Sequence, residues 1–396
     1  MEDIRKQAEV LREQTISDRR WLHEHAEVAF KEYETSDWIY EQLKKMPELE
    51  VSRPCETGVY AVLRTGRPGK TIAVRAETDA LPMPEETGLP YASRNPGVMH
   101  SCGHDGHTAA LLNAIRILLK HRDELNGELR FIFQHAEELP PGGAVDMIRA
   151  GCMDGVDEVF GYHFTSTMQT GTFGICPGVM TSATDRFVVT VKGKGGHSSM
   201  PEACVDPVVI GAQIILAYQT IVSRRMNPRE TAVLSVCSAE AASAYNIIPH
   251  EMRLEGSIRT FSEEVRESFK RQLEEIARGI ARANGGDIEF EFHYGYGSVV
   301  NDIAMTKMGE ELIRRTFGDD AIVYLQPLMP GDDYSYYAQL CPSFYCEIGA
   351  GNKEKGITAP HHNPKYLMDE DVLPLAVEYV ATLVLARAAA GKESVC

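Results

Sequence analysis

A short glycine-rich segment gathers side chains that could bind a metal ion. Residues 99–107 read Met-His-Ser-Cys-Gly-His-Asp-Gly-His, in which Cys102 offers a thiolate and His104 an imidazole. Both groups suit zinc or a metal of similar softness. The alternative is a loop whose histidines only cap the helix that follows. These residues alone leave both interpretations open.

A second segment carries two adjacent carboxylates directly after an apolar strand. Glu137 and Glu138 follow the expected strand 129–134 (LRFIFQ). One glutamate could bind a metal while its neighbour takes a proton from water bound to that metal. The alternative is an exposed acidic pair at a helix N-terminus, where the helix dipole favours negative charge.

Two isolated histidines could complete a ligand set. His163 ends the expected strand 158–162, and His362 lies in the sequence Ala-Pro-His-His-Asn-Pro at 359–364. Each could by itself be an ordinary polar residue with its hydrogen bonds satisfied. The whole candidate set is Cys102, His104, Glu138, His163 and His362. Because these ligands are enough for two metals and Glu137 remains as a base, the combination favours a metal-dependent hydrolase.

Two interpretations from other classes compete with this one. A hydrolase with a cysteine nucleophile would use Cys102 together with His104 or His107. Chelators would leave such an enzyme active, whereas thiol alkylation would stop it. A catalytically silent metal-binding protein would need the ligands but not Glu137.

The elements that must position these residues alternate between strands and helices up to about residue 180. Strands are expected at 59–64, 71–76, 129–134 and 158–163, and helices at 12–27, 35–45, 108–119 and 143–150. Such alternation is typical of an α/β layer on a largely parallel sheet. In open α/β sheets, ligands bind beyond the carboxyl ends of the strands.

The middle of the chain has a different pattern. Strands at 186–192, 231–238, 252–260 and 287–294 and helices at 206–225 and 263–284 follow one another in the order βαββαβ, the arrangement of a ferredoxin-like unit. The α/β pattern resumes near residue 301 and ends in a helix at 372–388. We therefore expect an α/β catalytic domain, residues 1–184 and 299–396, interrupted by a ferredoxin-like domain, residues 185–298.

Composition excludes several classes of partner. The 396 residues include 40 basic and 57 acidic side chains, a net charge of −17, which opposes binding to nucleic acid or an anionic membrane. No apolar run approaches the roughly 18 residues of a membrane span, and the opening MEDIRKQAEV is not a secretory signal. The nine cysteines include no Cys-x-x-Cys pair, which favours reduced thiols and a cytoplasmic location.

Several motifs together resemble the M20 metallopeptidase family, and within it the amidohydrolase branch of aminoacylases, hippurate hydrolases and auxin-conjugate hydrolases. The matching stretches are RAETDAL at 75–81, GVMHSCGHDGHT at 97–108, residues 134–143, GKGGHSSMP at 193–201, NIIP at 246–249, GSIRTF at 256–261 and residues 362–364. They span the chain from about residue 20 to 370, and their combination is hard to meet by chance.

The resemblance implies a two-metal hydrolase of N-acyl amino acids. The implied metal ligands are Cys102, His104, Glu138, His163 and His362, with Cys102 bridging. Glu137 would be the general base that activates a metal-bound water and then protonates the departing amine. Zinc is the first expectation for the two divalent ions, with manganese, nickel and cobalt as alternatives.

The resemblance also assigns the middle domain as a lid and a dimerisation module. His197 would help to stabilise the oxyanion across a homodimer, and Asn246 and Arg259 would hold the carboxylate of the substrate. The alternatives are that His197 merely caps a loop and that Arg259 forms a structural ion pair.

The chain departs from the family pattern at His135, Glu77, Asp332 and residues 164–167, and none of these changes removes a ligand or the base. They do leave the acyl group undefined. We therefore expect cleavage of an N-acyl amino acid, for example an N-acetyl amino acid, to a carboxylate and a free amino acid. The alternative within the same chemistry is a dipeptidase or carboxypeptidase.

Overall fold

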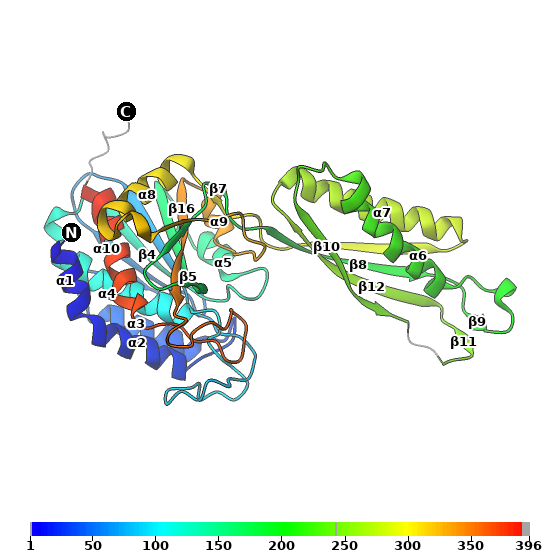
Figure 1. The fold of residues 1–396 in the computed structure, drawn as a ribbon, viewed down its shortest axis with the longest axis horizontal. Coiled ribbons are helices and arrows are strands. Elements are labelled where there is room, and N and C mark those ends of the chain that lie inside the picture. The colour runs from blue at the N-terminus through cyan, green and yellow to red at the C-terminus, as the bar shows by residue number, and fades with distance from the viewer. Residues whose placement is uncertain (1, 242–243, 390–396) are drawn as a thin grey trace. The chain divides into compact units, whose positions relative to one another are not determined.

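The computed structural model describes residues 2–241 and 244–389 and has a mixed α/β fold with a central sheet (Figure 1). The chain divides into two compact units. The first comprises Met1–Met180, Val300–Gln326 and Asp333–Cys396, and the second comprises Thr181–Val299 and Pro327–Asp332. Each unit has its own hydrophobic core. Cys396 lies outside the described residues, and the eight described cysteines are all free thiols.

The first unit is built on an eight-stranded sheet. In spatial order its strands are β1 (Glu50–Ser52), β2 (Val59–Arg64), β4 (Glu128–Gln134), β3 (Thr71–Glu77), β5 (Glu158–Gln169), β16 (Ser343–Gly351), β6 (Phe173–Ile175) and β15 (Ile322–Tyr324). The four central strands β4, β3, β5 and β16 run parallel to one another. Antiparallel pairs lie on either side, β1 with β2 and β2 with β4, and β16 with β6. The sheet is therefore parallel in its middle with an antiparallel pairing on each side of it, and the edge strand β15 again pairs parallel with β6.

Helices cover this sheet and supply much of its core. The helices α1 (Glu2–Val10), α2 (Arg12–Glu24), α4 (His104–Lys120) and α10 (Val372–Ala389) contact one another. The remaining helices of the unit are α3 (Tyr33–Lys44), α5 (Gly143–Arg149), α8 (Ile303–Phe317) and α9 (Ser335–Ala338). Helix α4 begins before the helix expected at 108–119, because Gly103 lacks a Cβ and adopts φ 92° at the N-cap. His104 is therefore a helical residue.

The register of the central strands aligns the segments that carry chemistry. Glu77 at the end of β3 pairs with Gln134 at the end of β4, and His163 on β5 pairs with Glu347 on β16. The segments that follow β3 and β4 therefore leave the sheet at the same edge. The expectation that His163 ends its strand is wrong, because pairing with β16 continues and β5 runs to Gln169.

The second unit contains a four-stranded antiparallel sheet and two helices. Along the chain these are β8 (Ala183–Lys192), α6 (Pro207–Thr220), β10 (Ala232–Glu240), β12 (Glu251–Thr260), α7 (Glu263–Ala283) and β13 (Asp287–Tyr294). The strands lie in the order β10-β12-β8-β13, and both helices contact the sheet and each other. Asp206 caps α6 by accepting a hydrogen bond from the Val208 N–H at 2.8 Å.

Within residues 2–241 and 244–389, two stretches are long and apolar enough to cross a membrane by length and composition alone, Pro207–Arg225 and Val372–Ala389. Both include a few polar residues, so neither is an uninterrupted apolar run. Helix α10 is a core helix, with 72% of its apolar window buried inside the protein. Helix α6 packs one face on β8 and β12 and leaves the other exposed. Both stretches are therefore parts of globular units.

Candidate metal centre

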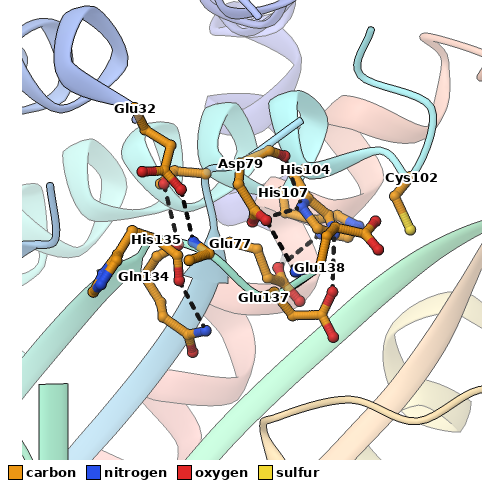
Figure 2. Close-up of polar contacts among 12 residues, drawn as sticks. Glu32, Glu77, Asp79, Cys102, His104, His107, Gln134, His135, Glu137 and Glu138 are labelled. Carbon is orange, nitrogen blue, oxygen red and sulfur yellow. Dashed lines mark hydrogen bonds and ion pairs between the residues drawn. The ribbon is translucent and has the colours of Figure 1, made fainter. Parts of the chain in front are cut away.

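The ligand atoms of the side chains expected to bind metal lie together in the first unit. Figure 2 shows His104, Glu137 and Glu138 close to one another, with Cys102 beside them. Cys102 lies in the loop just before α4, His104 is the first residue of α4, and the two glutamates lie in the turn after β4. His163 reaches the same place from β5, and His362 from the loop before α10.

One group of possible ligands comprises Cys102, His104 and His163. Their ligand atoms all lie within 4.8 Å of one another. Cys102 Sγ is 3.4 Å from His163 Nε2. A thiolate with two imidazoles is a ligand set that suits zinc and neighbouring transition metals.

A second group comprises Cys102, Glu138 and His362, whose ligand atoms also lie within 4.8 Å of one another. Glu138 Oε1 is 3.3 Å from His362 Nε2. His362 has φ 58°, and its N–H donates to the Ser101 carbonyl at 3.0 Å, next to Cys102. Because Cys102 belongs to both groups, its thiolate could bridge two cations.

The donor atoms at the centre fit a cation. His104 Nδ1 is 2.9 Å from the Asp79 carbonyl oxygen, so this nitrogen has a partner, whereas the buried His104 Nε2 has none. Glu138 Oε1 is likewise buried without a hydrogen bond. A histidine that donates one N–H to a neighbouring oxygen and turns its other nitrogen inward is the usual arrangement of a metal ligand.

The electrostatics of the centre reflect an excess of carboxylates. Burial lowers the pKa of His104, but the hydrogen bond and charge of Asp79 and the charges of Glu77 and Glu138 together outweigh it and raise that pKa to about 10. Burial and the carboxylates of Glu138 and Glu137 raise the pKa of the Cys102 thiol well above its usual value. A cation bound here would oppose both effects, because it favours the thiolate and a neutral imidazole.

Glu137 lies next to the donor atoms but is not needed in either group. Its Oε2 is 4.0 Å from His104 Nε2, and its side chain is largely buried. The neighbouring Glu138 N–H donates to Asp79 Oδ2 at 2.9 Å, which fixes the backbone on the far side of Glu137. The arrangement can therefore present the Glu137 carboxylate to a molecule at the centre.

His107, which a cysteine-nucleophile mechanism would use as a partner of Cys102, has a supporting role in the structure. The ligand atoms of Glu77, His104 and His107 also lie within 4.8 Å of one another. Both nitrogens of His107 are already occupied: Nδ1 is 2.8 Å from Glu77 Oε2, and Nε2 accepts the Phe164 N–H at 2.8 Å. His107 therefore supports the strand that carries His163 and is not available as a ligand. Nothing in the spacing of the motif shows this, because Glu77 and Phe164 lie far away in the sequence.

Three candidate substrate-binding residues lie in the second unit. His197 is on β9 (Gly196–His197), which pairs with β11 (Ile247–Ile248) just after Asn246. The Ser198 N–H donates to the Asn246 carbonyl at 3.1 Å, so the structure brings these two segments together. Arg259 lies on β12, where burial lowers its pKa. The charge of the Asp185 carboxylate opposes this lowering.

Comparison with known proteins identifies the family to which the chain is similar. Residues 73–386 match peptidase family M20/M25/M40. The chain is 47% identical over 300 residues to an N-acyl-L-amino acid amidohydrolase of Geobacillus stearothermophilus, covering 76% of this chain and 81% of that protein. It is 36% identical over 377 residues to an N-acetylcysteine deacetylase of Bacillus subtilis, covering 93% and 96% of the two chains.

A solved structure is similar over nearly the whole chain. It is the Bacillus subtilis YXEP protein, described as a dinuclear metal-binding peptidase from the M20 family. The two folds superpose with a TM-score of 0.84 at 33% sequence identity, covering 96% of this chain and 99% of the other.

Proposed function

This chain belongs to peptidase family M20/M25/M40 and is a hydrolase that acts on carbon–nitrogen bonds, and on that premise we propose that it cleaves the amide bond of N-acyl amino acids. The products are a carboxylate and a free amino acid, and N-acetyl amino acids are the first substrates to test. The observation that carries the proposal is the cluster of inward-facing ligand atoms around Cys102, with the carboxylate of Glu137 beside it.

The two groups of ligands support a centre that holds two divalent ions. Cys102, His104 and His163 would hold one divalent ion, and Cys102, Glu138 and His362 the other. When bound, the two ions would polarise the scissile carbonyl and make a water acidic enough to lose a proton near neutral pH. Because one ligand is a thiolate and three are imidazoles, zinc is our first choice, with manganese, nickel and cobalt as alternatives.

Glu137 carries out the proton transfers. Its carboxylate takes a proton from the attacking water and returns it to the nitrogen of the departing amine. This role fits a carboxylate that lies 4.0 Å from a ligand nitrogen and shares a 4.8 Å cluster with His104 and Glu138. Asp79 keeps His104 turned inward through the hydrogen bond at Nδ1.

The second unit is proposed to bind the substrate and a second copy of the chain as a ferredoxin-like lid and dimerisation domain, residues 185–298. Arg259 and Asn246 would hold the carboxylate of the amino acid, and His197 would stabilise the oxyanion. A homodimer is supported by the exposed apolar side chains Val208, Val209 and Leu216 on α6. The free state of the described cysteines supports a cytoplasmic location.

The first experiment measures amine release from N-acetyl, N-benzoyl and long-chain N-acyl amino acids and from dipeptides. Each substrate is tested with the protein as isolated, after chelation, and after zinc, manganese, nickel or cobalt is added back. Metal-dependent release from N-acyl amino acids supports the proposal. The alternative within the same chemistry, a dipeptidase or carboxypeptidase, would release amine from the dipeptides but not from the N-acyl amino acids. Release that survives chelation and stops on thiol alkylation would overturn the metal mechanism.

A further inference from the structure

Glu32 is a fully buried carboxylate outside the groups that form the metal centre. It occupies the N-cap of α3, yet its side chain makes no capping hydrogen bond. Glu27 provides that cap instead, because its carboxylate accepts the N–H groups of Glu34 at 3.2 Å and Thr35 at 2.9 Å. The carboxylate of Glu32 is therefore not used to cap α3 and can accept hydrogen bonds from other segments.

The hydrogen bonds of Glu32 reach the turn after β4. Its Oε1 accepts the N–H groups of Ala136 at 2.8 Å and Phe30 at 3.0 Å. Its Oε2 accepts the hydroxyl of Thr57 at 2.8 Å. Figure 2 shows the Glu32 carboxylate directed at this turn, next to the glutamates of the centre. A buried carboxylate with three donors is an unusually strong anchor for a backbone segment.

Ala136 needs such an anchor because of its backbone conformation. Among the described residues, only Phe30, Ala136 and His362 have a positive φ without being glycine. This conformation is unfavourable for an alanine, because its Cβ lies too close to the following carbonyl oxygen. Glu32 accepts the N–H of two of these three residues, and the Ala136 carbonyl accepts the Gly143 N–H at 3.1 Å. Both polar groups of the Ala136 backbone are thus held from outside the turn.

Glu137 therefore lies between two anchored N–H groups. Ala136 N–H is bound by Glu32 on one side, and Glu138 N–H is bound by Asp79 on the other. Fixing the backbone on both sides of Glu137 restricts the directions that its carboxylate can take. We propose that Glu32 is a positioning residue that holds Ala136 in its left-handed conformation and so aims the Glu137 carboxylate into the centre. The proposal rests on the proposed role of Glu137 as general base.

The test compares two substitutions of similar size. Glu32→Gln keeps an oxygen that can accept the Ala136 and Phe30 N–H groups, whereas Glu32→Met removes every acceptor. We expect kcat for N-acetyl amino acid hydrolysis to fall about 10- to 100-fold in Glu32→Met, with KM and a content of two metals per chain unchanged. Glu32→Gln should stay within about threefold of the wild type. Thr57→Val is the matched control, because it removes only the contact on the oxygen that faces away from the turn, and it should behave like Glu32→Gln.

A further variant separates positioning from general stability. Glycine adopts positive φ at no steric cost, so Ala136→Gly added to Glu32→Met should recover part of kcat. Equal kcat in the wild type and Glu32→Met would overturn the proposal. The proposal would also be overturned if kcat in Glu32→Met fell only in proportion to the loss of stability and if Ala136→Gly did not restore any of it.

Hydrogen exchange of the peptide 131–143 gives a readout that needs no substrate. It should become faster at Ala136 in Glu32→Met and stay slow in Glu32→Gln, and unchanged exchange in Glu32→Met would contradict the proposal. If the wild type releases no amine from any substrate, the proposed function fails, while the exchange experiment still decides the role of Glu32. If Glu32→Met does not fold, the exchange rates of Glu32→Gln and Thr57→Val decide the question. Glutamine keeps an oxygen that can accept the Ala136 N–H, so fast exchange at Ala136 in Glu32→Gln would contradict the proposal.

Discussion

The imidazole of His107 accepts the backbone N–H of Phe164 at 2.8 Å, and Phe164 directly follows His163. Because that N–H can only donate, Nε2 of His107 must carry a lone pair, and the proton of the neutral ring lies on Nδ1. Nδ1 donates to the Glu77 carboxylate at 2.8 Å, and Arg75 forms an ion pair with the same carboxylate. A chain of buried polar contacts therefore leads from β3 to the strand residue that is proposed to bind metal.

We expect His107→Leu to weaken metal binding without removing a ligand. The substitution leaves the Phe164 N–H without its acceptor, so His163 loses a contact that fixes its backbone. Loss of a supporting contact around a metal ligand typically costs about 10- to 100-fold in affinity. Calorimetric titration of the chelated protein measures the change. His121→Ala, at the other end of α4, is the control and should leave the affinity unchanged. Equal affinities for wild type and His107→Leu would contradict a supporting role.

The shared position of Cys102 predicts a difference in metal content between ligand variants. Cys102 belongs to both groups of donors, whereas His163 and His362 belong to one each. We therefore expect Cys102→Ala to retain neither cation with high affinity, and His163→Ala and His362→Ala to retain one per chain. Mass spectrometry of the bound metals provides the count. A Cys102→Ala variant that keeps two cations per chain would exclude the bridging position.

Glu137 and Glu138 are neighbours of identical chemistry, so they form a matched pair. Glu137→Gln removes the base but no ligand, and we expect kcat to fall about 100- to 10,000-fold while two metals per chain remain. Glu138→Gln should lose metal from the group that it shares with Cys102 and His362. Steady-state kinetics together with metal analysis distinguishes the two effects. Near-normal turnover in Glu137→Gln would show that another group transfers the proton.

Local sequence patterns predicted which segments carry the chemistry but not how they are supported. The expected strand 71–76 corresponds to β3 (Thr71–Glu77), and the expected strand 129–134 lies within β4. The segments that follow these apolar strands do lie at one sheet edge, as parallel pairing requires. The roles of the individual side chains at that edge remain predictions.

The supporting contacts join residues that are distant in the sequence, which is why the sequence did not reveal them. Glu32 and Ala136 are 104 positions apart, and His107 and Phe164 are 57 positions apart. Such pairs depend on the register of the sheet and on where helices begin. The start of α4 depends on a left-handed glycine, and the length of β5 depends on its pairing with β16, so neither was visible in local periodicity.

The pKa of Glu32 predicts how stability changes with pH. Burial, together with the nearby Asp79 carboxylate, raises the pKa of Glu32 to about 7, against 4.5 for an exposed glutamate. The folded protein therefore binds this proton more tightly than the unfolded chain does. This tighter proton binding adds to the free energy of unfolding. The added stability is fully present below about pH 4.5 and is lost as the pH rises through about 7, a change of about 3 kcal/mol for a pKa shift of this size. The difference in unfolding free energy between wild type and Glu32→Gln isolates this contribution, because other titrating groups cancel. We expect denaturant unfolding between pH 4.5 and 8 to show the wild type losing stability relative to Glu32→Gln as the pH rises. A constant difference across that range would mean that Glu32 has an ordinary pKa in the folded protein.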